Sequence, residues 1–145
     1  MDKAKTTREL LNVLKGASDA RELKDYVDAI SADPPAKSFA ELFRSLPRAK
    51  AADNARMIVD TNIERTYFYQ ILNGTRKPGR DKLLLLCLAA RLGLEDTRRC
   101  LEANGSALLY SRSRRDAIVI FALQKGLSAS ETNELLDEFG EEILV

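Results

Sequence analysis

Hydrophobic residues recur every three or four positions along most of the chain, and no long stretch alternates strictly between hydrophobic and polar residues. Leu23, Val27 and Ile30 show the pattern near the N-terminus, and Leu42 and Leu46 repeat it further on. An α-helix returns to the same face every 3.6 residues, whereas a half-buried strand alternates with a period of two. The pattern therefore predicts an all-α protein.

Residues 1–36 are expected to form an N-terminal helical extension with two helices. Thr6-Thr7-Arg8-Glu9 is a capping box at the start of the first helix, which a glycine closes. Ser18 or Asp19 caps the second helix, which ends before Pro34 and its neighbouring proline. No chemistry is suggested by this segment, so packing or contact with a partner is its expected role.

Residues 37–106 are expected to form a five-helix domain. Asn62 lies between two short helices, and asparagine is one of the few residues that tolerate a left-handed backbone. Two short helices joined by a three-residue turn are the arrangement of a helix-turn-helix unit. Pro47 stops the first helix, and Asn73-Gly74 ends the third. The expected helices cover residues 39–46, 54–59, 63–72 and 94–104, together with one that runs from Arg80 or Asp81 to Leu92. Ser38 and Asp53 cap the first two, and Gly93 closes the helix that ends at Leu92.

Residues 107–145 are expected to form a C-terminal helical hairpin, whose packing on the core of the preceding domain is left open. The hydrophobic run Ala117–Leu123 suits a buried helix or a strand equally well by periodicity. Its β-branched residues favour a strand, but the chain offers no partner strand, so we assign a helix. Gly126 ends this helix, and Ser128 or Ser130 caps the last one, whose outer face is acidic.

Composition narrows the classes of function. The chain contains no histidine, which excludes histidine-based general base catalysis and imidazole metal ligands. Its two cysteines, Cys87 and Cys100, are too few for a structural zinc site and are expected to fill core helix faces. Without a phosphate-cradling glycine loop or a convincing carboxylate pair, we expect no enzyme activity, no metal and no cofactor. No segment approaches the ~20 apolar residues of a membrane span and no leader opens the chain, so we expect a cytoplasmic protein.

The net charge of +1 conceals an uneven distribution. Residues 44–82 contain nine Lys/Arg and four Asp/Glu, a balance of +5, whereas residues 1–43 and 83–145 have balances of −1 and −3. A basic middle with neutral and acidic flanks is typical of a local phosphate-binding surface. Chance clustering on solvated helix faces would give the same totals, so charge alone leaves both interpretations open.

The segment Asp53–Pro78 contains the most specific motif of the chain. Its residues Phe68, Ile71, Asn73, Gly74, Arg76 and Pro78 form the pattern apolar-x-x-Ile-x-Asn-Gly-x-Arg-x-Pro at the end of the third expected helix. This segment resembles the phage-repressor type of helix-turn-helix domain, the Xre or Cro family, and the resemblance covers roughly residues 39–104. The tail from Arg114 to Leu136 is similar to that of bacterial proteins carrying this domain. The chain departs from the family pattern at Pro47 in the first helix, at Asn62 in place of a glycine, and at Glu64 in place of a Ser or Thr cap.

The resemblance implies sequence-specific binding of double-stranded DNA, with the helix at residues 63–72 in the major groove. It assigns base contacts to Arg65, Thr66 and Gln70, which lie opposite Phe68 and Ile71. It assigns contacts to the DNA backbone to Asn54, Tyr67, Asn73, Arg76 and Lys77. The chemistry is suitable, because arginine pairs with guanine, glutamine with adenine, and a threonine methyl contacts thymine.

The resemblance also implies a transcriptional regulator that binds as a homodimer, because one recognition helix spans only a few base pairs. The terminal hairpin or the first two helices would supply the dimer surface. The alternative is a protein-interaction adaptor, or an antitoxin or defence-associated component, that contacts a protein partner through residues 1–36 or 107–145. The near-zero net charge and the carboxylate of Glu64 favour this alternative, and the sequence leaves both functions open.

Overall fold

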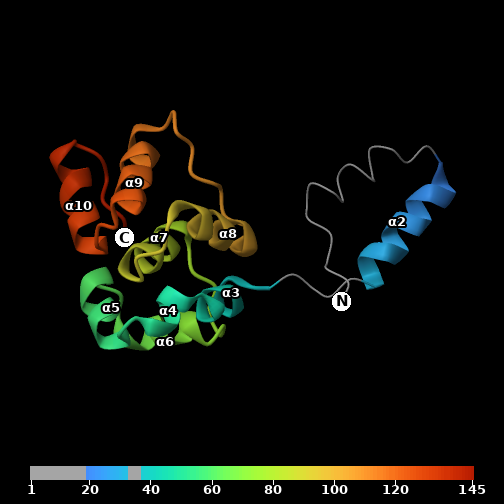
Figure 1. Cartoon of the computed structure of the whole chain (residues 1–145), viewed down its shortest axis with the longest axis horizontal. Helices are drawn as coiled ribbons and strands as arrows, with labels where there is room; N and C mark the ends of the chain where they lie inside the picture. The colour runs from blue at the N-terminus through green and yellow to red at the C-terminus, as the bar shows by residue number, and fades with distance from the viewer. Residues whose placement is uncertain (1–18, 33–36) are drawn as a thin grey trace. The chain divides into compact units, whose positions relative to one another are not determined.

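The computed structural model describes residues 19–32 and 37–145, and every regular element in these ranges is an α-helix (Figure 1). The all-α prediction is therefore confirmed for the described part of the chain. By its internal contacts the chain divides into two compact units, residues 1–36 and residues 37–145.

The first unit contributes one described helix, α2 (Ala20–Ala32), which confirms the second predicted helix of the extension. Asp19 is its cap, since the Asp19 carboxylate accepts the N–H of Glu22 at 2.8 Å. The helix expected over residues 6–16 lies outside the described residues.

The second unit is arranged around α7, whose residues Leu83–Leu88 are all buried. Its helices are α3 (Phe39–Ser45), α4 (Pro47–Ala51), α5 (Asn54–Thr61), α6 (Arg65–Leu72), α7 (Arg80–Ala89), α8 (Leu94–Asn104), α9 (Arg114–Lys125) and α10 (Ala129–Glu138). Figure 1 shows α7 between α5 and α6 on one side and α9 and α10 on the other. Cys87 and Cys100 are buried in this core, as predicted. None of the described helices is long and apolar enough to cross a membrane.

A short helix that the sequence pattern did not predict separates the first two expected helices. α3 ends at Ser45, and the backbone of Leu46 is extended, as the following proline requires. Pro47 does more than end α3, because it begins α4. Proline suits the first position of a helix, where its missing N–H would have no intrahelical partner. Residues 37–106 therefore contain six helices rather than five.

The prediction that α7 continues to Leu92 and is closed by Gly93 is wrong. α7 ends earlier, and Arg91 takes the left-handed conformation with φ of 60°. The N–H of Leu92 bonds to the carbonyl of Cys87 at 3.0 Å, so the last turn is closed in the manner of a Schellman motif. Gly93 has an ordinary φ of −76° and is instead the N-cap of α8.

The C-terminal segment forms two helices that pack on the core of α7. The run Ala117–Leu123 lies inside α9 and is helical, as predicted. Gly126 ends α9 with φ of 70°, and Ser128 caps α10 through a complete capping box with Glu131. The buried hydrophobic side chains of α9 and α10 belong to the same cluster as those of α7. The hairpin is therefore part of one core with the preceding helices.

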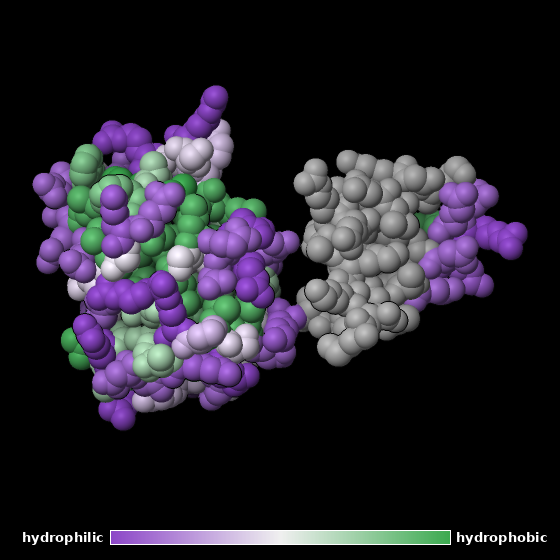
Figure 2. Space-filling view, in the orientation of Figure 1, coloured by the Kyte–Doolittle hydropathy of each residue, from purple (hydrophilic) through white to green (hydrophobic). Residues whose placement is uncertain are grey.

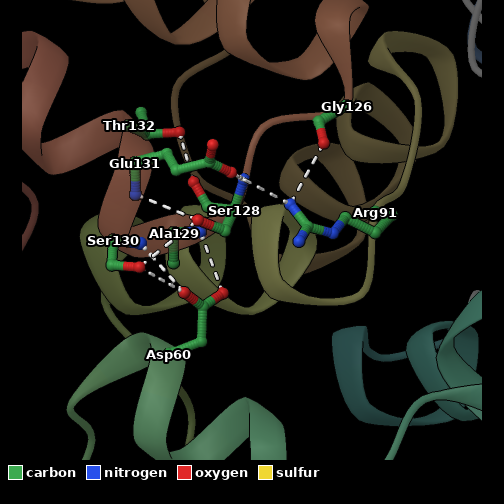
Figure 3. Close-up of polar contacts among 8 residues, drawn as sticks. All are labelled: Asp60, Arg91, Gly126, Ser128, Ala129, Ser130, Glu131 and Thr132. Carbon is green, nitrogen blue, oxygen red and sulfur yellow. Dashed lines mark hydrogen bonds and ion pairs between the residues drawn. The ribbon is translucent and has the colours of Figure 1, made fainter.

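Asp60, in the last turn of α5, ties the start of α10 to α5 (Figure 3). Its carboxylate accepts the N–H groups of Ala129 and Ser130 at 2.9 and 3.0 Å and the Ser130 hydroxyl at 2.8 Å. Arg91 donates to the carbonyl of Gly126 at 3.0 Å. The turn between α9 and α10 is thus held by α5 on one side and by the end of α7 on the other.

Candidate nucleic-acid interface

The turn between α5 and α6 is fixed by a small set of backbone and hydroxyl contacts. Asn62 takes the left-handed conformation that the sequence predicted, with φ of 56° and ψ of 24°. The Thr61 hydroxyl donates to the carbonyl of Met57 at 2.8 Å and accepts the N–H of Ile63 at 3.3 Å. Because Thr61 and Ile63 are both buried, these contacts determine the direction in which the chain enters α6.

α6 begins at Arg65 rather than at the predicted Ile63, because Glu64 is its N-cap. The two carboxylate oxygens of Glu64 accept the N–H groups of Thr66 and Tyr67 at 3.0 and 2.9 Å. The bond from Thr66, followed by that from Tyr67, holds the pKa of Glu64 below its ordinary value. The charge of Glu64 is therefore directed at the positive end of α6, which reduces its repulsion of a nearby phosphate.

α6 has one buried face and one exposed face. Phe68 and Ile71 are fully buried against the core. Arg65 and Thr66 are exposed, and Gln70 is half-buried. The three residues predicted to contact bases therefore reach the surface to different extents, with Arg65 and Thr66 the more accessible.

Tyr69 adds an aromatic surface to α6 that the sequence-based prediction did not include. Its ring is 38% exposed and lies edge-on to Phe68, with ring centroids 5.3 Å apart. The guanidinium of Arg65 lies 5.8 Å from the centre of the Tyr69 ring. The spacing of Arg and Tyr four residues apart on a helix is the signal that predicts this contact.

The loop after α6 lies against the start of that helix. The side-chain oxygen of Asn73 accepts the N–H of Thr75 at 2.8 Å, which shapes the loop. Arg76 then places its guanidinium 5.0 Å from the centre of the half-buried Tyr67 ring. Lys77 is exposed beside it. The contact between Arg76 and Tyr67 brings two predicted backbone-contacting residues together.

Asn54 is the predicted contact that lies apart from the others. It is the first residue of α5 and is half-buried. In the described part of the chain, no hydrogen bond or ring contact joins it to the seven predicted residues on α6 and its loop.

The carboxylates of residues 44–82 are all engaged with groups of the protein. Asp53 caps α5, Asp60 accepts hydrogen bonds from the start of α10, Glu64 caps α6, and Asp81 pairs with Arg115 at 2.9 Å. Partial burial raises the pKa of Asp60, but the hydrogen bonds from Ser130 and Ala129 outweigh it and lower the pKa overall. All four carboxylates are therefore directed at the protein's own N–H and guanidinium groups.

Most of the basic side chains in residues 44–82 form no ion pair with a described carboxylate of the protein. Within the described residues, Arg80 alone among the nine forms an ion pair, with Asp116 at 2.9 Å. The others are Arg44, Arg48, Lys50, Arg56, Arg65, Arg76, Lys77 and Lys82, and all but the half-buried Lys82 are exposed. Seven exposed cations of this range therefore form no ion pair with a described residue and are available to an anionic partner.

No family model matches this sequence, and no curated protein and no solved structure matches the chain. The functional conclusion therefore rests on the geometry of α5, α6 and the loop that follows. Among the described residues, no group of three or more Cys, Asp or Glu side chains is placed to hold a metal ion.

Two exposed cations lie on α4, the helix that the sequence pattern missed. Arg48 and Lys50 follow Pro47 in its single turn. Proline's preference for the first position of a helix is the signal that identifies α4 from the sequence. Arg48 and Lys50 are exposed and add positive charge outside α6 and its loop.

Proposed function

We propose that this chain binds double-stranded DNA with α6 in the major groove, as a transcriptional regulator of the repressor type of helix-turn-helix protein. The observation that carries the proposal is the positive charge of α6 and its loop, because Arg65, Arg76 and Lys77 are exposed and form no ion pair with a described carboxylate. A positively charged surface of this kind binds the DNA backbone because its cations displace the counterions that surround the DNA phosphates.

Arg65 and Thr66 are the base-contacting residues that the geometry supports best. Both are exposed at the start of α6, the end of a recognition helix that approaches base edges. Arg65 can donate two hydrogen bonds to guanine, and the half-buried Gln70 can pair with adenine further along the helix. One bidentate pair is worth about 1–3 kcal/mol of discrimination between bases.

Arg76, Lys77 and Asn73 are proposed to hold phosphates beside the recognition helix. The stacking of Arg76 on Tyr67 limits the motion of its guanidinium, so less entropy is lost when it binds a phosphate. Asn54 would contact a further phosphate from the start of α5. Such contacts set the position of α6 and carry no sequence information.

The test is equilibrium binding to a mixed-sequence duplex, measured by fluorescence anisotropy over a range of salt concentrations. The wild type is expected to bind with a steep dependence on salt. Arg76→Ala/Lys77→Ala is expected to reduce the slope of log K against log salt by about two, one for each lost phosphate contact. Arg65→Ala/Gln70→Ala is expected mainly to relax the preference for a selected sequence.

A matched control is Arg98→Ala/Arg99→Ala on α8. It removes the same number of positive charges from side chains that already pair with Glu95, Glu102 and Asp96. This variant should keep the salt slope of the wild type. Absence of binding at low salt, or an equal loss in the control and loop variants, would reject the proposal.

We also propose that the protein binds DNA as a homodimer through the C-terminal hairpin. Figure 2 shows hydrophobic surface in the part of residues 37–145 that α9 and α10 form. Phe121 on α9 and Phe139 after α10 are 47% and 54% exposed. A dimer would read two half-sites about 34 Å apart. Sedimentation velocity should detect a dimer, free or on DNA, that Phe121→Ser weakens, and a monomer under both conditions would contradict this part.

A further inference from the structure

The unit of residues 37–145 contains an open groove of about 830 Å³ between α4, α5, the end of α7 and the start of α10. No residue of α6 or of the loop after it lines this groove. It is therefore a different surface from the proposed DNA interface, and its role has to follow from its own chemistry.

The apolar part of the groove lining, called its floor below, consists mostly of alanines. Four alanines from α4 and α7 or their ends line it, together with the buried Met57. Val59 stands at the side and is 82% exposed, the highest value among the large hydrophobic residues of the described chain. Small residues beside an exposed branched side chain allow the backbone of another segment to approach closely and to cover Val59.

Three arginines give the groove its charge. Arg48 donates to the backbone carbonyl of Arg91 at 2.6 Å, and Arg91 donates to that of Gly126 at 3.0 Å, so both guanidiniums are positioned by carbonyl groups (Figure 3 shows Arg91). Arg91 lies 3.8 Å from the exposed carboxylate of Glu131, a long ion pair. Arg56 forms no hydrogen bond or ion pair with any described residue.

The two carboxylates in the lining, Asp53 and Asp60, form no ion pair with Arg48 or Arg56. Asp53 accepts the N–H of Ala55 at 3.1 Å as the cap of α5. Asp60 accepts three hydrogen bonds from Ala129 and Ser130 (Figure 3). Their oxygens are directed at helix N-termini. Arg48 and Arg56 form no ion pair with a described residue, so they are the positive groups that the groove offers beside its apolar floor.

We propose that this groove binds an acidic amphipathic segment of a partner protein. Hydrophobic residues of that segment would cover Val59 and the alanines, while its Asp or Glu side chains would pair with Arg56 and Arg48. The apolar floor favours a peptide over nucleic acid, because a sugar-phosphate backbone offers little apolar surface to bury against Val59. The proposal is independent of DNA binding and gives the protein a second surface that can be occupied at the same time as α6.

The test uses the full chain and a fluorescently labelled synthetic peptide with leucine at every third or fourth position and glutamate between. Anisotropy should show saturable binding. Arg56→Glu and Val59→Asp should each weaken it by roughly tenfold or more, since each removes a central contact. Both side chains are exposed, so the variants should melt at the wild-type temperature. Arg65→Ala/Gln70→Ala, on the other surface, should keep full affinity for the peptide.

A peptide with lysine in place of every glutamate is the matched control and should not bind. Equal binding of the lysine peptide, unchanged affinity in the groove variants, or no saturable binding of the acidic peptide would each overturn the proposal. A loss of DNA affinity in Arg56→Glu and Val59→Asp without a loss of peptide affinity would assign the groove to the nucleic-acid surface instead. Failure of DNA binding alone would leave the peptide result unaffected.

Discussion

Arg80 and Asp116, at the starts of α7 and α9, form a two-point ion pair with distances of 3.1 and 2.9 Å. Asp81, the next residue of α7, and Arg115, the preceding residue of α9, form a second ion pair in which α9 supplies the arginine and α7 the carboxylate. Arg115 donates to Asp81 at 3.2 and 2.9 Å. The two N-termini are thus joined by reciprocal pairs. Because Arg80 follows the basic loop directly, these pairs connect the C-terminal hairpin to the proposed interface.

We predict that Asp116→Ala destabilises the fold by about 2–3 kcal/mol. The Asp116 carboxylate also accepts the N–H of Tyr110 at 2.9 Å, so the substitution leaves that backbone donor without its acceptor. Arg80 would lose its ion pair and keep only its bonds to the carbonyls of Ala107 and Leu108. Urea unfolding measures the loss. The comparison is Arg99→Ala, which breaks an exposed pair with Asp96 and should cost less than about 0.5 kcal/mol. Equal, small losses would show that the Arg80–Asp116 pair does not hold the hairpin.

Asn62→Ala should destabilise the protein by about 1 kcal/mol, because alanine is strained at the left-handed φ of 56°. Asn62→Gly should be neutral or slightly stabilising, since glycine adopts this conformation without strain. Thermal melts monitored by circular dichroism distinguish the two variants. If alanine and glycine behave alike, backbone strain at Asn62 does not shape the turn between α5 and α6.

The contact between Asp60 and α10 should depend on pH. The pKa of Asp60 is lower in the folded protein than its ordinary value of 3.8, so its stabilising contribution is present above that value. It is lost as the pH falls through the lower folded value. Asp60→Asn should lower the free energy of unfolding by about 1–2 kcal/mol at neutral pH. The loss is no larger because Asp60 is partly exposed and solvent screens its charge. Unfolding in urea at several pH values should show this cost shrinking below pH 3.8.

Ser130→Ala is the matched variant for that experiment. It removes one of the three hydrogen bonds that Asp60 accepts and keeps the backbone donors. Its cost should be smaller than that of Asp60→Asn and should shrink over the same acidic range. A cost of Asp60→Asn that stays constant down to the acid transition would contradict the assigned role of the carboxylate.

The two thiols should report global unfolding. Cys87 and Cys100 have no exposed surface, and burial raises the pKa of the Cys87 thiol. Ellman's reagent should therefore react with neither thiol in the native protein, and the reaction should follow unfolding as urea is added. Rapid labelling of either thiol without denaturant would mean that α7 and α8 separate locally.

Much of the fold is encoded locally and could be predicted from the sequence. Ser38, Asp53 and Ser128 cap helices where their side chains suggested, because an N-cap depends on residues within one turn. The helix over Ala117–Leu123 followed from the absence of a partner strand rather than from its own period. Residue preferences at N-caps do not identify every cap, because Glu64 caps α6 at a position where Ser or Thr is more common.

The features that were missed depend on contacts between distant segments. Asp60 accepts hydrogen bonds from residues about seventy positions away, and Arg80 pairs with Asp116 across 36 positions. No local sequence pattern predicts such pairs, because every Asp and Glu of the chain offers the same acceptor group and the sequence does not show which one the fold brings close. The early end of α7 is of the same kind. Arg91 takes a conformation that favours glycine while its side chain bonds to Gly126, on the turn after α9.

The most direct test of the central claim is the NMR spectrum of the ¹⁵N-labelled chain as duplex DNA is added. We predict the largest amide shifts in residues 65–70 and 73–77, with the side-chain signals of Arg65 and Arg76 among those that move. The amides of α9 and α10 lie outside the proposed DNA interface and should change less than those of α6. Shifts confined to the C-terminal hairpin, or no shifts at low salt, would contradict the assignment of α6 as a recognition helix.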